Sequence, residues 1–311
     1  GAVVVSSVKT GEILASANYP SYDLDTYYSD YQSIASAPNT PLYDRAFRGL
    51  YPPGSAYKPI VAVAGLQESI IDRYTTIFCK KKYTFYEDSQ PSCMHYHGNV
   101  NVISAISQSC NYFFFDVGRQ VGITKLNQYS RNFGLGELTG IETTESKGIL
   151  AGPKYSASVG KPWYAGLTLS AAIGQSDNSF TPLQLAVYTS TIANGGKRLK
   201  ATLLNSVKSA TTNEDVYKTE PQVVAEVGAS ESVMNTVKEG MLSVTSEGTA
   251  RAYFENYPIA VGGKTGTAQT TGLDNSVLII FAPYDDPEIA ISIVVEHGEK
   301  SYSTGPVAKA I

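Results

Sequence analysis

Apolar and β-branched residues cluster near the two ends of the chain. Residues 2–5 and 12–17 have the pattern of two strands, and residues 9–11 (Lys-Thr-Gly) lie between them as a hairpin turn. Residues 277–282 and 289–296 are strongly β-like and are separated by a short segment rich in Pro and Asp. This pattern predicts one antiparallel sheet that is shared by the N-terminal hairpin and the C-terminal strands.

The middle of the chain carries helix signals instead. Residues 59–68 are mostly apolar and are good helix formers, and Thr181 followed by Pro182 is typical of a helix start. The other predicted helices span residues 102–108, 112–121, 124–133, 182–193, 230–244 and 303–311. We therefore expect an α+β fold, in which helices pack on an antiparallel sheet and a helical lobe covers about residues 45–196.

The remaining segments have weaker patterns. Strand-like stretches occur at residues 199–207, 222–227 and 257–261, and the sheet-forming segments are expected at about residues 1–20 and 199–311. Residues 18–44, 136–163 and 262–272 are rich in turn-forming residues and are predicted to be irregular. We expect a single domain over residues 1–311.

Composition excludes some classes of protein. The 311 residues are 42% hydrophobic and 17% charged, which is typical of a globular protein. The net charge is −4 and there is no basic tract, so a nucleic-acid-binding function is not indicated. No run of about 18 apolar residues is present, and the chain opens directly on a strand-like segment. We expect it to be the soluble unit of a longer protein, without its membrane anchor.

The first candidate for chemistry is Ser55, which follows the sequence Tyr-Pro-Pro-Gly and precedes the predicted helix at residues 59–68. Lys58 lies one helical turn further on, and residues three apart share a helical face. A serine hydroxyl becomes a good nucleophile when a neighbouring base takes its proton. A buried lysine can be that base, because burial favours the neutral amine. In isolation, a helix cap followed by a solvated lysine would explain the same pattern.

Two later stretches change that judgement. Ser109-Cys110-Asn111 lies between two predicted helices, and Lys264-Thr265-Gly266-Thr267 follows a strand-like segment. Each alone would be read as an ordinary turn. The ordered set S-x-x-K, S-x-N and K-T-G is the signature of penicillin-binding proteins and serine β-lactamases. All three motifs occur here in order and in suitable contexts.

Taken together, these motifs and several others make the whole chain resemble the transpeptidase domain of a class B penicillin-binding protein. The other similar stretches are residues 51–59, 181–186 (Thr-Pro-Leu-Gln-Leu-Ala), 193–196 (Ala-Asn-Gly-Gly), 248–250 and 263–269. The resemblance favours the elongation-type (rod-shape) branch, while the division-type and sporulation-type branches share much of the pattern. It implies the penicillin-binding-protein/serine β-lactamase-like fold, and it implies that a membrane anchor and a pedestal domain precede this unit in the full protein.

The resemblance also implies an activity, the cross-linking of peptidoglycan. Ser55 would attack the D-Ala–D-Ala carbonyl of one stem peptide, and an amine of a second stem peptide would take the acyl group. Lys58 would be the base for acylation and Ser109 would relay a proton to the leaving amine. β-Lactams would acylate Ser55 as substrate mimics, and no cofactor is implied for catalysis.

The same resemblance assigns the remaining site residues. Asn111 would orient Lys58 and bind the substrate backbone, and Lys264 would place positive charge near the substrate carboxylate. Thr265 and Thr267 would offer hydroxyls to that carboxylate, while Gly266 would allow close approach of the substrate. The backbone N–H groups of Ser55 and Thr267 would form the oxyanion hole. The implied setting is the extracytoplasmic face of the bacterial membrane, with a SEDS-type membrane glycosyltransferase as partner.

A cysteine- and histidine-rich segment at residues 77–98 stands apart from these motifs and is predicted to be a β-hairpin. Thiolates and imidazoles at this density suit a structural zinc ion, although the spacing matches no standard zinc module. A disulfide between Cys79 and Cys93, or unpaired buried cysteines, would also explain the segment. The candidate zinc ligands are Cys79, Cys93, His95 and His97, and either Asp88 or Cys110 could replace one of the histidines.

Two other functions remain open at this point. A serine β-lactamase or a β-lactam-sensing domain would use the same acylation chemistry, but a β-lactamase also needs a base that activates water. No Glu or Asp has the loop context of such a base in one lactamase class, and a carboxylated lysine remains an alternative. The third function is a non-catalytic scaffold with this fold. The sequence argues against a scaffold, because every nucleophile and base position is filled.

Overall fold

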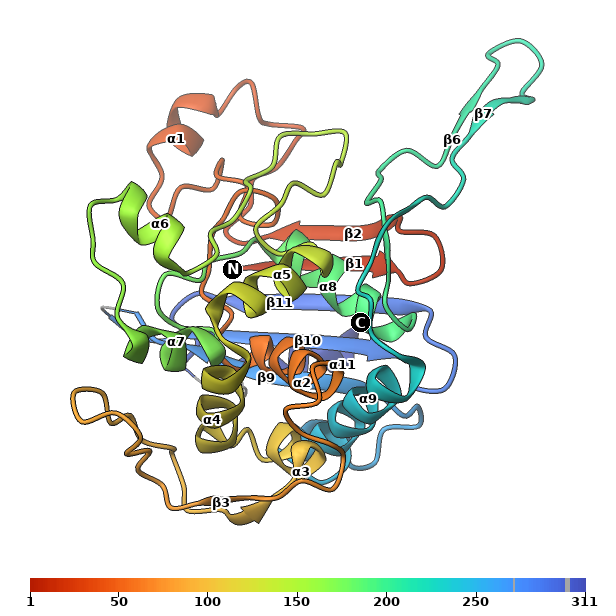
Figure 1. Ribbon diagram of the computed structural model, residues 1–311. Coiled ribbons are helices and arrows are strands. Elements are labelled where there is room, and N and C mark those ends of the chain that lie inside the picture. The colour runs from red at the N-terminus through yellow and green to blue at the C-terminus, as the bar shows by residue number, and fades with distance from the viewer. Residues whose placement is uncertain (271, 300–302) are drawn as a thin grey trace.

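A computed structural model describes residues 1–270, 272–299 and 303–311, and within them five strands form one antiparallel sheet (Figure 1). The strand order is β2-β1-β11-β10-β9, so the two ends of the chain meet in the middle of the sheet, as the sequence predicts. The strands span Ala2–Ser7 (β1), Ile13–Asn18 (β2), Gly262–Ala268 (β9), Asn275–Ala282 (β10) and Ile289–Val295 (β11).

The register of the sheet follows from its apolar strands. Val3 of β1 pairs with Ile293 of β11, and Ile279 of β10 pairs with Ser292 of β11. Strands β10 and β11 are buried along nearly their whole length, which explains their continuous β-branched sequence. The turn between β1 and β2 contains Gly11 at φ +80°, a left-handed conformation that favours glycine.

The position of the edge strand β9 differs from the prediction. The sequence analysis placed a strand at residues 257–261 and a loop at 262–272, whereas the strand occupies Gly262–Ala268. Its glycines and threonines lack an apolar pattern. Small residues are required there because the backbone of residues 53–56 packs directly against the strand. Thr271, in the predicted loop, lies outside the described residues.

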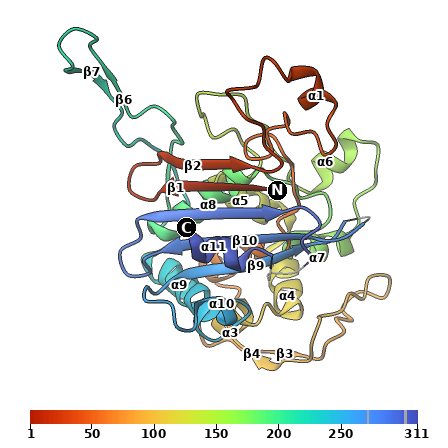
Figure 2. The ribbon, with the colours of Figure 1, turned by 180° about the vertical axis from the view of Figure 1, so that it is seen from behind.

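Helices cover both faces of the sheet. Figures 1 and 2 show α2 and α8 on one face and α11 on the opposite face. Every residue of α8 is buried, and its first turn is fixed by a capping box between Thr181 and Gln184. The main helices are α2 (Lys58–Gln67), α3 (Val102–Ser107), α4 (Asn111–Val121), α5 (Ile123–Asn132), α8 (Pro182–Ala193), α9 (Glu231–Ser246) and α11 (Gly305–Ala310), close to their predicted bounds.

Smaller helices occur where the sequence predicted irregular chain or gave no clear pattern. They are α1 (Tyr31–Ser36), the 3₁₀ turn η1 (Gly54–Tyr57), α6 (Pro153–Ser158), α7 (Ala165–Ala172) and α10 (Arg251–Phe254). Most are six residues or shorter, so they present too few turns for a helical period to be visible in the sequence. Across the described ranges, the helices all fall short of the length and apolarity that crossing a membrane would require.

Three two-stranded sheets lie outside the main sheet. The hairpin predicted at residues 77–98 is present, with β3 (Ile77–Cys79) paired to β4 (Gly98–Val100). Among the described residues, the strand-like stretches at 199–207 and 222–227 add no strand to the main sheet, contrary to the prediction, although Thr202 makes an isolated bridge to Glu12 beside β2. Residues in or next to these stretches form β5 (Lys197–Leu199), β6 (Ser206–Lys208) and β8 (Val223–Glu226), whereas β7 (Asp215–Lys218), which pairs with β6, lies outside both predicted stretches. Strand β7 is exposed along its whole length and so has no face to bury against the sheet; β6 and β7 project from the body in Figure 1.

Candidate active site

The candidate nucleophile, Ser55, lies in η1, which leads directly into α2. The preceding Pro52 and Pro53 prevent the helix from starting earlier, and Gly54 takes φ +52° to turn the chain into η1. The Lys58 backbone N–H donates to the Ser55 carbonyl, so the two residues occupy one tight turn. Ser55 remains half-buried while its neighbours in the turn are buried.

The Lys58 side chain is completely buried and points to the S-x-N motif. Its Nζ donates to Asn111 Oδ1 at 2.6 Å, to the Ser109 carbonyl at 2.7 Å and to Ser109 Oγ at 3.1 Å. Ser109 has φ +57°, and this unusual backbone conformation presents both its carbonyl and its hydroxyl to the amine. The ring of Phe114 lies 5.5 Å below Nζ and excludes water on that side.

A second buried lysine approaches the same hydroxyl from the sheet. Lys264 of β9 donates to Ser109 Oγ at 3.0 Å and to the Thr265 carbonyl at 2.9 Å. The Thr265 hydroxyl shares a hydrogen bond of 2.7 Å with Thr249. Ser109 Oγ therefore lies between two lysines, and the three sequence motifs meet at one point.

Burial controls the charge of both lysines. It lowers the pKa of Lys58 to about 7, although the thiols of Cys110 and Cys93 act in the opposite direction. Burial also holds the pKa of Lys264 well below its ordinary value, and the positive charge of Lys58 lowers it further. A lysine with a pKa near 7 is able to exchange a proton at neutral pH, which an exposed lysine cannot do effectively.

Strand β9 lies against the nucleophile turn without side chains between them. A Cβ atom placed on Gly266 would be 2.4 Å from the Pro53 carbonyl oxygen, and one on Gly54 would be 2.4 Å from the Thr267 carbonyl oxygen. Such contacts are too short for any side chain to be accommodated without movement. Glycine at both positions therefore brings the backbone of Ser55 next to that of Thr267, the two N–H groups expected to form an oxyanion hole.

Gln175, a polar residue for which a turn role is the equally good interpretation from the sequence, also reaches the site. The structure places its Nε2 atom 3.3 Å from the Thr267 carbonyl oxygen, to which it donates. Asp177, two residues further along, is half-buried in the same turn. The contact joins residues that are 92 apart in the sequence, so the sequence alone does not place Gln175 beside Thr267.

Four cysteine and histidine side chains gather beside this network. The ligand atoms of Cys79, Cys93, His97 and Cys110 all lie within 4.8 Å of one another, and the three cysteines are buried with free thiols. His95, predicted as a ligand, is exposed and outside this group, and Cys110 takes its place. Residues 94 and 95 form a bend before β4, so the period of two that would put His95 and His97 on one face of a strand does not apply; His95 is exposed while His97 is partly buried with the thiols.

Asp88, the other alternative ligand, is exposed and also lies outside the group. Within the group, the Asn111 backbone N–H donates to Cys93 Sγ at 3.2 Å. The neighbouring Cys110 thiol, together with backbone N–H donors, lowers the pKa of Cys93 to about 4, and Cys93 in turn raises the pKa of Cys110. The site thus favours a thiolate at Cys93, the form that binds metals.

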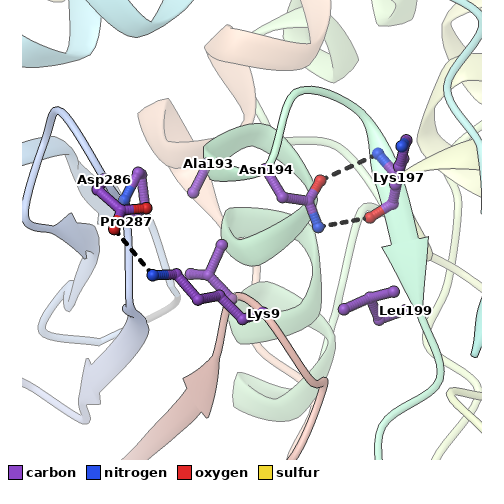
Figure 3. Close-up of a pocket in the computed structure, with 8 residues that line it drawn as sticks. Lys9, Ala193, Asn194, Lys197, Leu199, Asp286 and Pro287 are labelled. Carbon is purple, nitrogen blue, oxygen red and sulfur yellow. Dashed lines mark hydrogen bonds and ion pairs between the residues drawn. The ribbon is translucent and has the colours of Figure 1, made fainter. Parts of the chain in front are cut away.

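The S-x-x-K, S-x-N and K-T-G motifs do not line the cavity drawn in Figure 3. That cavity has a volume of about 310 Å³ and lies between the β1–β2 turn, the end of α8 and the β10–β11 turn. An ion pair of 2.8 Å between Lys9 and Asp286 crosses it, and Asn194 binds the backbone of Lys197. The Ala-Asn-Gly-Gly stretch thus fixes the end of α8, away from the catalytic motifs.

Comparison with known proteins assigns the fold. The family model described as "Penicillin binding protein transpeptidase domain" matches residues 1–311. Peptidoglycan D,D-transpeptidase MrdA of Acinetobacter baumannii is 33% identical over 338 residues, covering 100% of this chain and 50% of the relative. Stage V sporulation protein D of Bacillus subtilis is 30% identical over 323 residues, covering 99% of this chain and 47% of the relative. The chain spans about half the length of these curated relatives.

Solved structures agree with the sequence matches. PBP2 of Pseudomonas aeruginosa superposes with a TM-score of 0.89 at 30% identity, covering 99% of this chain and 72% of that chain. PBP2 of Helicobacter pylori, solved in a complex with MreC, superposes with a TM-score of 0.86 at 30% identity, covering 99% of this chain and 58% of that chain. The predicted α+β fold and the predicted family are both confirmed: the chain belongs to the penicillin-binding protein transpeptidase domain family.

Proposed function

We propose that this domain is a peptidoglycan D,D-transpeptidase that works through an acyl-enzyme on Ser55 and that β-lactams acylate and inhibit. The observation that carries the proposal is the buried amine of Lys58, held by Ser109 and Asn111 one turn from Ser55. A buried amine whose pKa is lowered to about 7, in the same turn as a half-buried serine, suits the activation of a nucleophile. The names of the relatives, which are peptidoglycan D,D-transpeptidases, support the same reaction.

The reaction uses each part of the network. Ser55 Oγ attacks the carbonyl carbon of the penultimate D-Ala while Lys58 Nζ takes its proton. The oxyanion forms against the N–H groups of Ser55 and Thr267. The C–N bond then breaks, and a proton passes through Ser109 Oγ to the leaving D-Ala. The amine of a second stem peptide attacks the ester in the reverse sequence and releases Ser55.

The hydrogen bonds of the second lysine support a role in substrate binding. Lys264 is held next to Ser109 Oγ, and Thr265 keeps its hydroxyl at the site through Thr249. The amine of Lys264 and two hydroxyls, from Thr265 and Thr267, are donors that suit the terminal carboxylate of a D-Ala–D-Ala peptide. The same carboxylate is present in β-lactams, so one set of contacts serves both ligands.

Intact-mass measurement after mixing with benzylpenicillin tests the proposed function. We expect the wild type to gain the mass of the drug within minutes and to keep it for hours, whereas Ser55→Ala gains none, because the acyl group has no other activated hydroxyl to join. An adduct that disappears while the drug is hydrolysed would instead support the β-lactamase. A folded wild type without any adduct would support the scaffold.

We further infer that the protein acts in cell elongation at the extracytoplasmic face of the membrane, with a SEDS-type glycosyltransferase as partner. The elongation-type assignment rests on the Thr-Pro-Leu-Gln-Leu-Ala and Ala-Asn-Gly-Gly stretches and on the similarity to MrdA. The Helicobacter pylori PBP2 that resembles this chain was solved in a complex with MreC, which supports a role alongside partner proteins. Co-purification of the full-length protein with the glycosyltransferase from membranes tests the partner.

We also propose that Cys79, Cys93, His97 and Cys110 bind a structural zinc ion. Three thiol groups and one imidazole within 4.8 Å match the Cys₃His donor set of structural zinc sites. Cys110 stands between Ser109 and Asn111, and Cys79 ends β3, so the ion would tie the hairpin to the S-x-N motif. When bound, zinc supplies a fixed tetrahedral cross-link and takes no part in acyl transfer.

Metal analysis of protein purified without added zinc tests this site. We expect about one zinc ion per chain in the wild type and strong loss of zinc in His97→Ala, because a structural site needs all four ligands. His95→Ala is the matched control, since that histidine lies outside the group and should leave the zinc content unchanged. A zinc-free wild type whose mass is two protons lower would show a disulfide instead.

A further inference from the structure

The turn after α7, residues 174–176, contacts both elements that frame Ser55. The Gly174 carbonyl accepts the Gly54 backbone N–H at 3.0 Å, so it holds the residue immediately before the nucleophile. The next residue, Gln175, donates its side-chain amide to the Thr267 carbonyl at 3.3 Å. This turn therefore joins the nucleophile turn to the edge strand β9.

The Thr267 carbonyl is not an ordinary sheet acceptor. A Cβ atom on Gly54 would lie 2.4 Å from its oxygen and 3.2 Å from the Thr267 nitrogen, so both backbone atoms face the nucleophile turn and not β10. In an antiparallel strand the N–H and C=O of one residue point to the same side. Thr267 thus offers one donor and one acceptor at the free edge of the sheet, where an extended peptide can add as a further strand.

The backbone around Gln175 is fixed, which defines where its side chain points. The Gln175 N–H donates to the Ser170 carbonyl at 3.0 Å, and Gly174 takes φ +73°. A Cβ atom on Gly174 would lie 2.1 Å from the Gly54 carbonyl oxygen, so the turn packs directly on the nucleophile turn. Ser176 follows at φ +63°, a conformation that non-glycine residues adopt only when their surroundings impose it.

We propose that Gln175 is a positioning residue for the acyl donor: its amide holds the Thr267 carbonyl so that this oxygen accepts an N–H group of the substrate. The inference rests on the proposed function and names the chemical group that it recognises, the peptide N–H of the stem peptide or the acylamino N–H of a β-lactam. A carbonyl oxygen has two lone pairs, so it can accept from Gln175 and from the substrate together. The hydrogen bonds of Lys58 Nζ go to Ser109 and Asn111, so the base keeps its partners when Gln175 is replaced.

Two β-lactams that differ at one group test the proposal. Benzylpenicillin carries an acylamino N–H, whereas penicillanic acid carries only hydrogen at the same ring carbon. We expect Gln175→Met to lower the second-order rate constant for acylation by benzylpenicillin by about fivefold to tenfold, the effect of one weakened hydrogen bond. The rate constant for penicillanic acid should change by less than about twofold, because that compound does not use the Thr267 carbonyl.

The matched control is Gln120→Met, which removes an amide that donates to Asp116 on the surface of α4. It should leave both rate constants unchanged. Equal losses for both compounds in Gln175→Met would overturn the inference, because they would show a general structural defect. A gain with benzylpenicillin would overturn it too, because Gln175 would then compete with the substrate. If neither compound acylates the wild-type protein, that result would contradict both the proposed function and this inference.

Discussion

Replacement of Lys58 by methionine is expected to slow the acylation of Ser55 by benzylpenicillin by about 10²- to 10⁴-fold, the range for loss of a general base. Methionine is similar in length and apolar, so it fills the buried space beside Phe114 but cannot accept a proton. The measurement is the rate of appearance of the acyl-enzyme at saturating drug. That rate isolates the chemical step from the affinity for the drug.

The pH dependence of the same rate gives an independent test. The pKa of Lys58 is lowered to about 7, so the amine is protonated below that pH and cannot take the proton of Ser55. The acylation rate of the wild type should therefore rise with pH and level off above a midpoint near 7. In Lys58→Met this rise should be absent from about pH 5 to about pH 9.

A matched control separates loss of the base from loss of any lysine. Lys9→Met removes an exposed lysine that pairs with Asp286, far from the motifs, and should be acylated at the wild-type rate. Lys58→Met also leaves the Asn111 oxygen without its donor, so the thermal midpoint of each variant must be recorded. Acylation of folded Lys58→Met at close to the wild-type rate would exclude Lys58 as the base.

The sequence predicted the parts of the fold whose pattern is local. Strands β1, β10 and β11 carry runs of β-branched or apolar residues, and α8 begins with Thr181 and Pro182 as expected. The meeting of Lys58, Ser109 and Lys264 was also predictable, although no single motif was convincing. Their order along the chain and their contexts together point to one candidate site, because unrelated turns seldom reproduce all three.

The remaining features depend on contacts between distant segments. Strand β9 was missed because its glycines serve the contact with η1 and so have no apolar period. Gln175 is not assigned to the site from the sequence, because a turn role fits this residue equally well and its partner, Thr267, is 92 residues away. Cys110 was only an alternative ligand, since the sequence cannot show that α4 begins beside the hairpin and places that thiol against Cys93. In each case three-dimensional proximity supplies the information that residue type and spacing lack.

Substitution of Gly266 by alanine should abolish most of the activity while the fold persists. Gly266 does not have a positive φ, so alanine can adopt its backbone conformation without strain. Its Cβ atom, however, would lie 2.4 Å from the Pro53 carbonyl oxygen and 3.2 Å from the Ala56 nitrogen. These are backbone atoms of the nucleophile turn and the residue before it, so they cannot rotate away as a side chain would. Strand β9 and η1 must therefore move apart.

The separation acts on catalysis through the oxyanion hole. The N–H groups of Ser55 and Thr267 would no longer converge on one oxygen, and loss of one such donor lowers the acylation rate by about 10²- to 10³-fold. Gly272→Ala is the matched control, because a Cβ atom there meets no neighbour within 4 Å. We expect Gly272→Ala to be acylated normally and Gly266→Ala to keep a folded circular dichroism spectrum with little acylation. The added methyl group is apolar and uncharged, so a loss of acylation rate would reflect only the increased separation of β9 from η1. Near-normal acylation of Gly266→Ala would show that this close approach is not required.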